Sequence, residues 1–191
     1  SQAQLFWFDR SGKRLGTVGG PENYYPGFLN LSPKGTRVAV GILDAAGLSD
    51  VWLLDLERGI RSKFTLDPGD DSHAVWSPDG SQIVYASRAS GMKFTLLRKA
   101  TTSAGIVEPL LSTTAGDFSS SGWSPDGEFI LYTSQPLGGK NDLLALPLDG
   151  DRTPRPVVQT EHDEGDGRFS PDGRWIAYVS DASGRFEVYV T

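Results

Sequence analysis

The chain has 191 residues, of which 38% are hydrophobic and 10% aromatic, so it carries enough apolar side chain for a core and too much for a disordered segment. It has no Cys, which excludes disulfides, thiolate nucleophiles and Cys-ligated zinc. The net charge is -6, with neither a basic run nor an apolar run of about 20 residues, so we expect no nucleic acid partner and no membrane span.

One short motif recurs four times along the chain. It is an aromatic residue or Leu followed by Ser-Pro-x-Gly, at residues 31–35, 76–80, 123–127 and 169–173. The successive serines are 45, 47 and 46 residues apart. This period is close to the ~40–45 residues of a four-stranded propeller blade. Pro sets φ for the second position of a β-turn and Gly tolerates positive φ, so each copy is predicted to be a hairpin turn.

The segments after each turn repeat as well. Apolar, β-rich second strands are expected at residues 37–40, 83–85, 129–132 and 175–178. Third strands follow at one fixed offset, at Trp52, Leu97, Leu144 and Val190. Weaker outer strands are expected at 62–65, 107–110 and 156–158, with Pro marking an edge. The sequence therefore predicts one all-β domain over 1–191, a β-propeller of about four four-stranded antiparallel blades at 28–65, 74–111, 121–158 and 167–191.

The two ends of the repeat array predict how the ring closes. Residues 5–9 resemble a third strand and residues 14–18 a fourth, whereas residues 186–190 are a third strand with no fourth after it. We therefore expect residues 1–18 to supply outer strands that complete the last blade, which would hide exposed sheet edges. This leaves one strand too many. It is an extra edge strand, it pairs between chains, or the natural protein has more blades.

The Ser-Pro-Asp-Gly turns after Trp or Phe, with Ile/Val/Ala-Tyr strands following, resemble the bacterial TolB-like propellers, relatives of the WD40-like repeats. The first copy departs from the pattern with Leu31 and Lys34. The resemblance implies a propeller that binds proteins or small ligands, either in the periplasm or as an accessory domain of a larger kinase or peptidase. An extracytoplasmic location is expected from this resemblance alone.

Acidic residues gather in the predicted connections between blades, at 19–30, 66–75, 112–122 and 159–168. These connections share one face of a propeller with the loops after each second strand, and loops on a rigid scaffold often carry function. A negative potential at a channel mouth favours a cation or a basic partner, and the alternative is a simply solvated face. The residues expected on this binding face are Tyr24, Tyr25, Asp70, Asp71, His73, Asp117, Phe118, His162, Asp163 and Asp166.

Both histidines lie in these acidic segments, and carboxylates with imidazole can ligate a divalent cation such as calcium or magnesium. The spacing matches no defined metal motif. The metal-ligand candidates are Asp70, Asp71, His73, Glu161, His162 and Asp163. No cofactor is otherwise required.

No catalytic residue is predicted. Asp126 stands where a Gly-x-Ser-x-Gly elbow needs its second Gly, and Ser124 is already explained by the turn. The expected function is a non-enzymatic binding domain for a protein, peptide, small ligand or cation. The alternatives are an incomplete propeller that assembles into oligomers through its unpaired outer strands, and an accessory domain of a larger kinase or peptidase.

Overall fold

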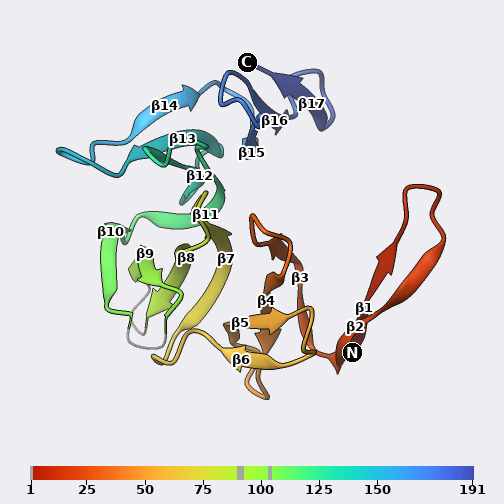
Figure 1. Ribbon diagram of the computed structural model, residues 1–191. Coiled ribbons are helices and arrows are strands. Elements are labelled where there is room, and N and C mark those ends of the chain that lie inside the picture. The colour runs from red at the N-terminus through yellow and green to blue at the C-terminus, as the bar shows by residue number, and fades with distance from the viewer. Residues whose placement is uncertain (1, 90–92, 103–104) are drawn as a thin grey trace.

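A computed structural model describes residues 2–89, 93–102 and 105–191 of the chain, and all regular elements in these ranges are β-strands (Figure 1). Within the same ranges there is no helix of the length and apolarity that a membrane crossing requires. The strands are β1 (Ala3–Phe8), β2 (Arg14–Glu22), β3 (Tyr24–Leu31), β4 (Arg37–Leu43), β5 (Ser49–Asp55), β6 (Arg61–Lys63), β7 (Asp70–Trp76), β8 (Gln82–Ala89), β9 (Lys93–Ala100), β10 (Val107–Thr113), β11 (Gly116–Trp123), β12 (Phe129–Pro136), β13 (Asp142–Pro147), β14 (Arg155–Val158), β15 (Glu164–Phe169), β16 (Ile176–Ser180) and β17 (Glu187–Val190).

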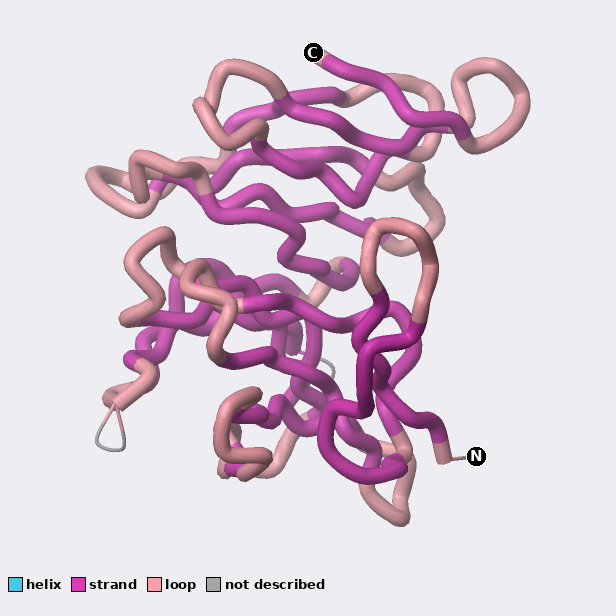
Figure 2. Tube along the Cα trace, turned by 45° about the vertical axis from the view of Figure 1, so that its right-hand side comes forward, coloured by secondary structure: helices cyan, strands magenta, loops and turns pink. Residues whose placement is uncertain are grey.

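The strands form the predicted propeller blades. Blade 1 is the sheet β3-β4-β5-β6, blade 2 is β7-β8-β9-β10, blade 3 is β11-β12-β13-β14, and blade 4 has the three strands β15-β16-β17. Every pairing is antiparallel and joins strands that are neighbours in sequence. Figure 2 shows the sheets stacked one on another, as blades of a propeller are. The all-β propeller architecture predicted from the repeat is thus confirmed.

The core lies between blades. Phe64 of blade 1 packs with Trp76 and Ile83 of blade 2 in one cluster of buried residues. Leu96 of blade 2 packs with Ile130 of blade 3 in a second cluster. A blade that is covered on both faces is expected to have a second strand that is apolar at nearly every position. The second strands of blades 1 to 3 show this pattern.

The Ser-Pro-x-Gly motif forms the hairpin turn that its chemistry predicts. In the second copy, the Gly80 amide donates to the Ser77 carbonyl at 2.9 Å, and Gly80 has a φ of 73°. The Ser77 hydroxyl accepts from the Gln82 amide at 2.9 Å and donates to the Asp79 carboxylate at 2.6 Å. In the first copy Lys34 has no carboxylate to offer, so the Ser32 hydroxyl keeps its bond from the Arg37 amide without a carboxylate partner, and the Gly35 amide still donates to the Ser32 carbonyl at 2.8 Å.

The N-terminal strands do not complete blade 4, which corrects the sequence-based expectation. β1 and β2 pair with each other in a separate two-stranded sheet. Leu5 and Val18 of this hairpin pack against Val38 and Val40 of blade 1, on the face opposite blade 2. The hairpin therefore takes the place of the outer half of a blade preceding blade 1. Burial of the apolar face of β4 stabilises this position.

The first strand of each blade, which we call the inner strand, begins earlier in the sequence than predicted. Most residues of the acidic connections belong to β3, β7, β11 and β15, whereas residues 66–69 and 159–163 lie in loops. Each inner strand contains a β-bulge before its turn motif. Within the bulges of β7 and β15, His73 and Asp166 adopt the left-handed φ values of 53° and 54°. Non-glycine residues in this region are uncommon and are often found at functional sites.

Candidate binding site at the blade junctions

The strand register defines the face on which the acidic residues lie. Asp70 pairs with Arg88, Asp117 with Gln135, and Glu164 with Ser180, so the start of each inner strand lies beside the end of the second strand. The Ser-Pro-x-Gly turns are at the other end of the same strands. We call the end of the blades where the inner strands begin and the second strands finish the junction face. All ten residues expected on a binding face come from strands or loops at this end.

Several of these acidic side chains hold neighbouring blades together. The Asp70 carboxylate accepts a hydrogen bond from the Ser49 amide of blade 1 at 3.0 Å and pairs with Arg88 at 2.8 Å. In the same way, Asp163 accepts from the Asn141 amide of blade 3 at 3.0 Å and pairs with Lys140 at 2.6 Å. Their role in the fold is to join an inner strand to the third strand of the preceding blade.

Two further carboxylates are buried at the same junctions, at one shared repeat position. Asp71 and Glu164 are each only 2% exposed. Burial raises the pKa of Asp71, and hydrogen bonds with Ser87 and Thr65 oppose that rise. Glu164 accepts hydrogen bonds from the hydroxyls of Thr160 and Ser180. Asp71 was expected on the binding surface, but it lies in the interior of the junction because its hydroxyl partners are there.

A cavity of about 390 Å³ opens between blades 2 and 3 on the junction face. Its walls come from β7, β8, β9, β11 and β12, and Tyr25 is added from β3. The lining is mainly polar and includes Asp70, Ser72, His73, Ser87, Arg88, Asp117, Ser119 and Gln135, with Phe94 and Phe118 as aromatic walls. Of the ten residues predicted for the binding face, the cavity brings five together: Tyr25, Asp70, His73, Asp117 and Phe118.

His73 is held in place by its strand bulge and by aromatic neighbours. Its ring centroid is 6.0 Å from that of Tyr25 and 6.1 Å from that of Phe28. Its Nδ1 is 2.9 Å from the Ser72 hydroxyl, and its carbonyl accepts a hydrogen bond from Ser120. Burial lowers the pKa of His73, so the imidazole is neutral at neutral pH.

Two carboxylates line the cavity, Asp70 and Asp117, and among the described residues only Asp70 forms an ion pair. Burial raises the pKa of Asp117, and the hydrogen bond from the Phe118 amide and the charge of Arg88 oppose that rise only in part. The Asp117 carboxylate accepts this hydrogen bond from the Phe118 amide at 2.6 Å. The aromatic ring of Phe118 packs edge-on against Tyr132, with ring centroids 5.3 Å apart.

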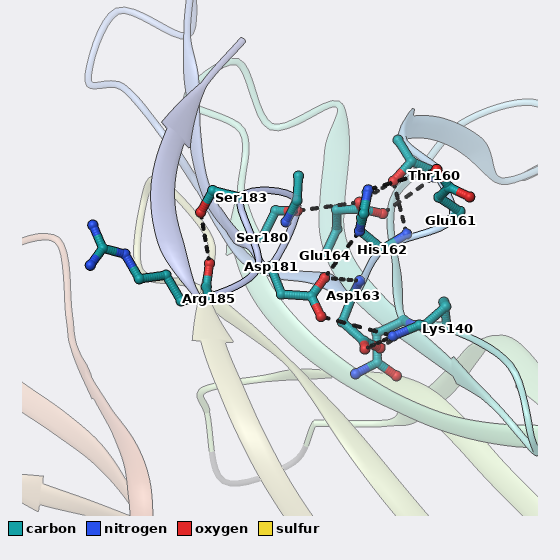
Figure 3. Close-up of polar contacts among 12 residues, drawn as sticks. Lys140, Thr160, Glu161, His162, Asp163, Glu164, Ser180, Asp181, Ser183 and Arg185 are labelled. Carbon is teal, nitrogen blue, oxygen red and sulfur yellow. Dashed lines mark hydrogen bonds and ion pairs between the residues drawn. The ribbon is translucent and has the colours of Figure 1, made fainter.

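The other predicted cluster, around His162, is a closed network (Figure 3). His162 Nδ1 is 3.6 Å from Asp181 Oδ1, and the Asp163 amide donates to the same carboxylate at 2.9 Å. Asp163 itself is paired with Lys140. Within the described residues, no group of three or more His, Asp or Glu side chains is arranged to hold a metal ion. The metal candidates near His73 and near His162 belong to different junctions and do not meet.

The cavity has one feature of a hydrolytic site, the contact between Ser72 and His73. A working triad requires a carboxylate that orients the second ring nitrogen of the base. Among the described residues, the only side-chain hydrogen bond of the His73 ring is with Ser72. Ser72 is also the neighbour of His73 in sequence, so this contact is local. The cavity is a polar space with hydrogen-bond donors and acceptors from several strands around it.

The chain shares its fold with several solved propellers. TolB from Acinetobacter baumannii matches with a TM-score of 0.80 and 20% identity over 98% of this chain, and a putative TolB from Agrobacterium tumefaciens with 0.71 and 20% over 99%. A prolyl endopeptidase structure matches with 0.65 and 18% over 100%. The chain spans 46%, 75% and 31% of these proteins, respectively. No protein-family model matches the chain.

The fold and the cavity together define a β-propeller with a polar site between two blades. More particularly, the fold is that of a TolB-like β-propeller, as the turn motif and its spacing predicted.

Proposed function

We propose that this chain is a non-enzymatic binding domain that recognises a protein or peptide on its junction face. The observation that carries the proposal is the polar cavity between blades 2 and 3, which presents Tyr25, His73 and Asp117 from three different inner strands. Strands place side chains more precisely than loops do, so these three side chains are preorganised for a ligand.

The structural neighbours include TolB proteins and several enzymes, among them a hydrazine synthase at a TM-score of 0.66, and a shared fold does not define a function. The two neighbours with the higher TM-scores are TolB proteins, whereas peptidases and an oligogalacturonate lyase match at 0.61 to 0.65. The peptidase matches favour a second candidate, an accessory propeller domain of a larger enzyme. An extracytoplasmic location is part of the proposal and rests on the likeness to TolB.

Selection of peptides from a random phage library against the immobilised chain tests the main proposal. Ser119 lies in the cavity wall, so Ser119→Tyr should fill the mouth and abolish binding of the selected peptides. Lys34→Tyr places the same side chain on the exposed turn at the opposite end of the blades and is the matched control. If both variants bind the peptides as well as the parent chain does, the junction face is not the recognition surface.

Self-assembly is the alternative that a specific surface favours. Blade 4 exposes Trp175, Phe186, Val188 and Val190, with exposed fractions of 52% to 73%. Exposed apolar patches of this kind mark interaction surfaces. A monodisperse dimer in light scattering that dissociates on deletion of residues 1–9, or on Val188→Lys, would favour assembly. A monomer that neither change affects would exclude it.

A further inference from the structure

Three aspartates occupy one repeat position, six residues before the aromatic residue of the turn motif. They are Asp70, Asp117 and Asp163. Each begins or precedes an inner strand on the junction face, and each lies where two blades meet. The repeat therefore offers a comparison of one carboxylate in three similar settings.

At two of the three junctions the carboxylate is fully engaged. Asp70 and Asp163 each accept a hydrogen bond from a backbone amide of the preceding blade at 3.0 Å, and each pairs with a cationic side chain. The amides belong to Ser49 and Asn141, which begin or precede the third strand of that blade. We call a junction closed when its aspartate has both an amide donor and an ion pair, as at these two, and open when it has neither.

Among the described residues, the junction between blades 2 and 3 shows neither contact, although Lys93 stands at the repeat position of Lys140. The strand position that Arg88 occupies opposite Asp70 is Gln135 opposite Asp117, and a neutral amide cannot supply a positive charge. Phe94 stands at the repeat position of Ser49 and Asn141, but within the described residues the only hydrogen bond to the Asp117 carboxylate is the one from Phe118. The same residues give Asp117 no ion pair.

The cavity lies at this open junction. Its volume of about 390 Å³ is bounded on one side by Asp117 and Gln135 and on others by the aromatic rings of Tyr25 and Phe94. The other charges nearby are largely committed, because Arg88 is paired with Asp70, and burial keeps His73 neutral. A half-buried carboxylate that forms no ion pair among the described residues is suited to a ligand that brings a positive charge and N–H donors.

We propose that this cavity binds a cationic group with N–H donors, a guanidinium or primary ammonium on an aliphatic stem, as presented by a basic side chain of a peptide. The ligand completes at the middle junction the pairing that Arg88 and Lys140 make at the other two. The inference rests on the proposed binding function and adds to it the class of group that is recognised.

Titration of the isotopically labelled chain with Nα-acetyl-arginine amide, followed by NMR, tests the proposal. We expect shifts at His73, Asp117 and Ser119, and a fall in the pKa of Asp117 when the cavity is saturated, because a bound cation favours the ionised carboxylate. Asp163 is the internal control and should not titrate differently. Ethylguanidine reports whether a small free cation suffices, and tetramethylammonium has the charge without N–H donors and should bind at least about tenfold more weakly.

Three variants make the test specific. Asp117→Asn should weaken binding of the arginine derivative by about tenfold or more, since it removes the charged acceptor. Gln135→Arg places in blade 3 the residue that blade 2 has at position 88, and should abolish binding by pairing with Asp117 internally. Asp163→Asn removes the equivalent carboxylate at a closed junction and should leave binding unchanged in the folded protein, as judged by its NMR spectrum.

The proposal is overturned if Asp117→Asn and Gln135→Arg bind the arginine derivative as the parent chain does, or if acetate causes the same shifts. The outcome is separable from that of the proposed function. Selected peptides that bind the junction face without any basic residue would refute the cationic ligand alone. Binding of the arginine derivative with no peptide selected at this face would instead refute the recognition role.

Discussion

Replacing Leu143 and Gly167, singly and together, tests whether blades 3 and 4 are joined by one tightly fitted contact. Leu143 in β13 is 0% exposed. A Cβ added to Gly167 in β15 would lie 2.7 Å and 2.8 Å from the two terminal methyl carbons of Leu143. Gly167 has no positive φ, so the clash is the main effect of adding a side chain there.

The single substitutions should each be costly, for opposite reasons. Leu143→Ala opens a cavity and should lower the free energy of unfolding by about 3 kcal/mol. Gly167→Ala overpacks the junction and should lower it by about 1–3 kcal/mol. In the double variant the new methyl group occupies space that Leu143 has left, so the loss should be smaller than the sum of the two single losses by about 1–2 kcal/mol.

Urea denaturation followed by Trp fluorescence measures all four proteins of this cycle. Gly165→Ala is a useful comparison because its added Cβ would meet Thr133, with the nearest atom at 3.0 Å, rather than Leu143. It should show no coupling to Leu143→Ala. If the losses for Leu143→Ala and Gly167→Ala add to within about 0.5 kcal/mol, the two residues do not form one fitted contact and the reasoning is refuted.

Three further predictions concern stability. Ser121→Ala should be neutral or slightly stabilising in urea denaturation, because the buried Ser121 hydroxyl has no hydrogen-bond partner among the described residues; a loss above about 1 kcal/mol would reveal a partner. Gly80→Ala should lower the free energy of unfolding by about 1–2 kcal/mol, since φ is 73° there and the nearest atom to an added Cβ, at 3.6 Å, leaves room for it; an unchanged denaturation midpoint would contradict this. The Ser77 hydroxyl and neighbouring amides lower the pKa of Asp79 to about 2, so its contribution is present above the ordinary pKa of about 4 and is lost as the pH falls toward 2. Acid denaturation of Asp79→Asn should therefore show a weaker pH dependence in that window than the parent chain, and an identical profile would exclude the effect.

The repeated turn motif and its spacing were enough to predict most of the fold. Turn chemistry is local, so Ser77, Pro78 and Gly80 could be assigned to a hairpin turn without knowledge of their surroundings, and the fixed offsets then placed second and third strands correctly. The inner strands were harder to delimit, because their bulges and acidic residues look like loop sequence. His73 and Asp166 lie within the bulges of their strands, where they adopt a left-handed φ and have no partner in the strand register.

The place of the N-terminal hairpin was decided by tertiary packing. Residues 5–9 and 14–18 have the same strand pattern whether they extend blade 4 or cover blade 1. The apolar face of β4, with Val38 and Val40, packs against Leu5 and Val18 and settles the choice. Sequence periodicity describes which residues share a strand face, but it contains no information on which of two apolar faces a strand will contact.

The sequence by itself determined the four-blade repeat, its turns and the residue types gathered on the junction face. Only the tertiary structure separated those residues by role. Asp70, Asp117 and Asp163 are the same residue at the same repeat position, yet Asp70 and Asp163 bind a backbone amide of the preceding blade and Asp117, among the described residues, does not. The difference lies in the groups that the adjacent blade and strand bring within reach of each carboxylate, because hydrogen bonds and ion pairs act over a few ångströms and depend on contacts between residues far apart in the chain.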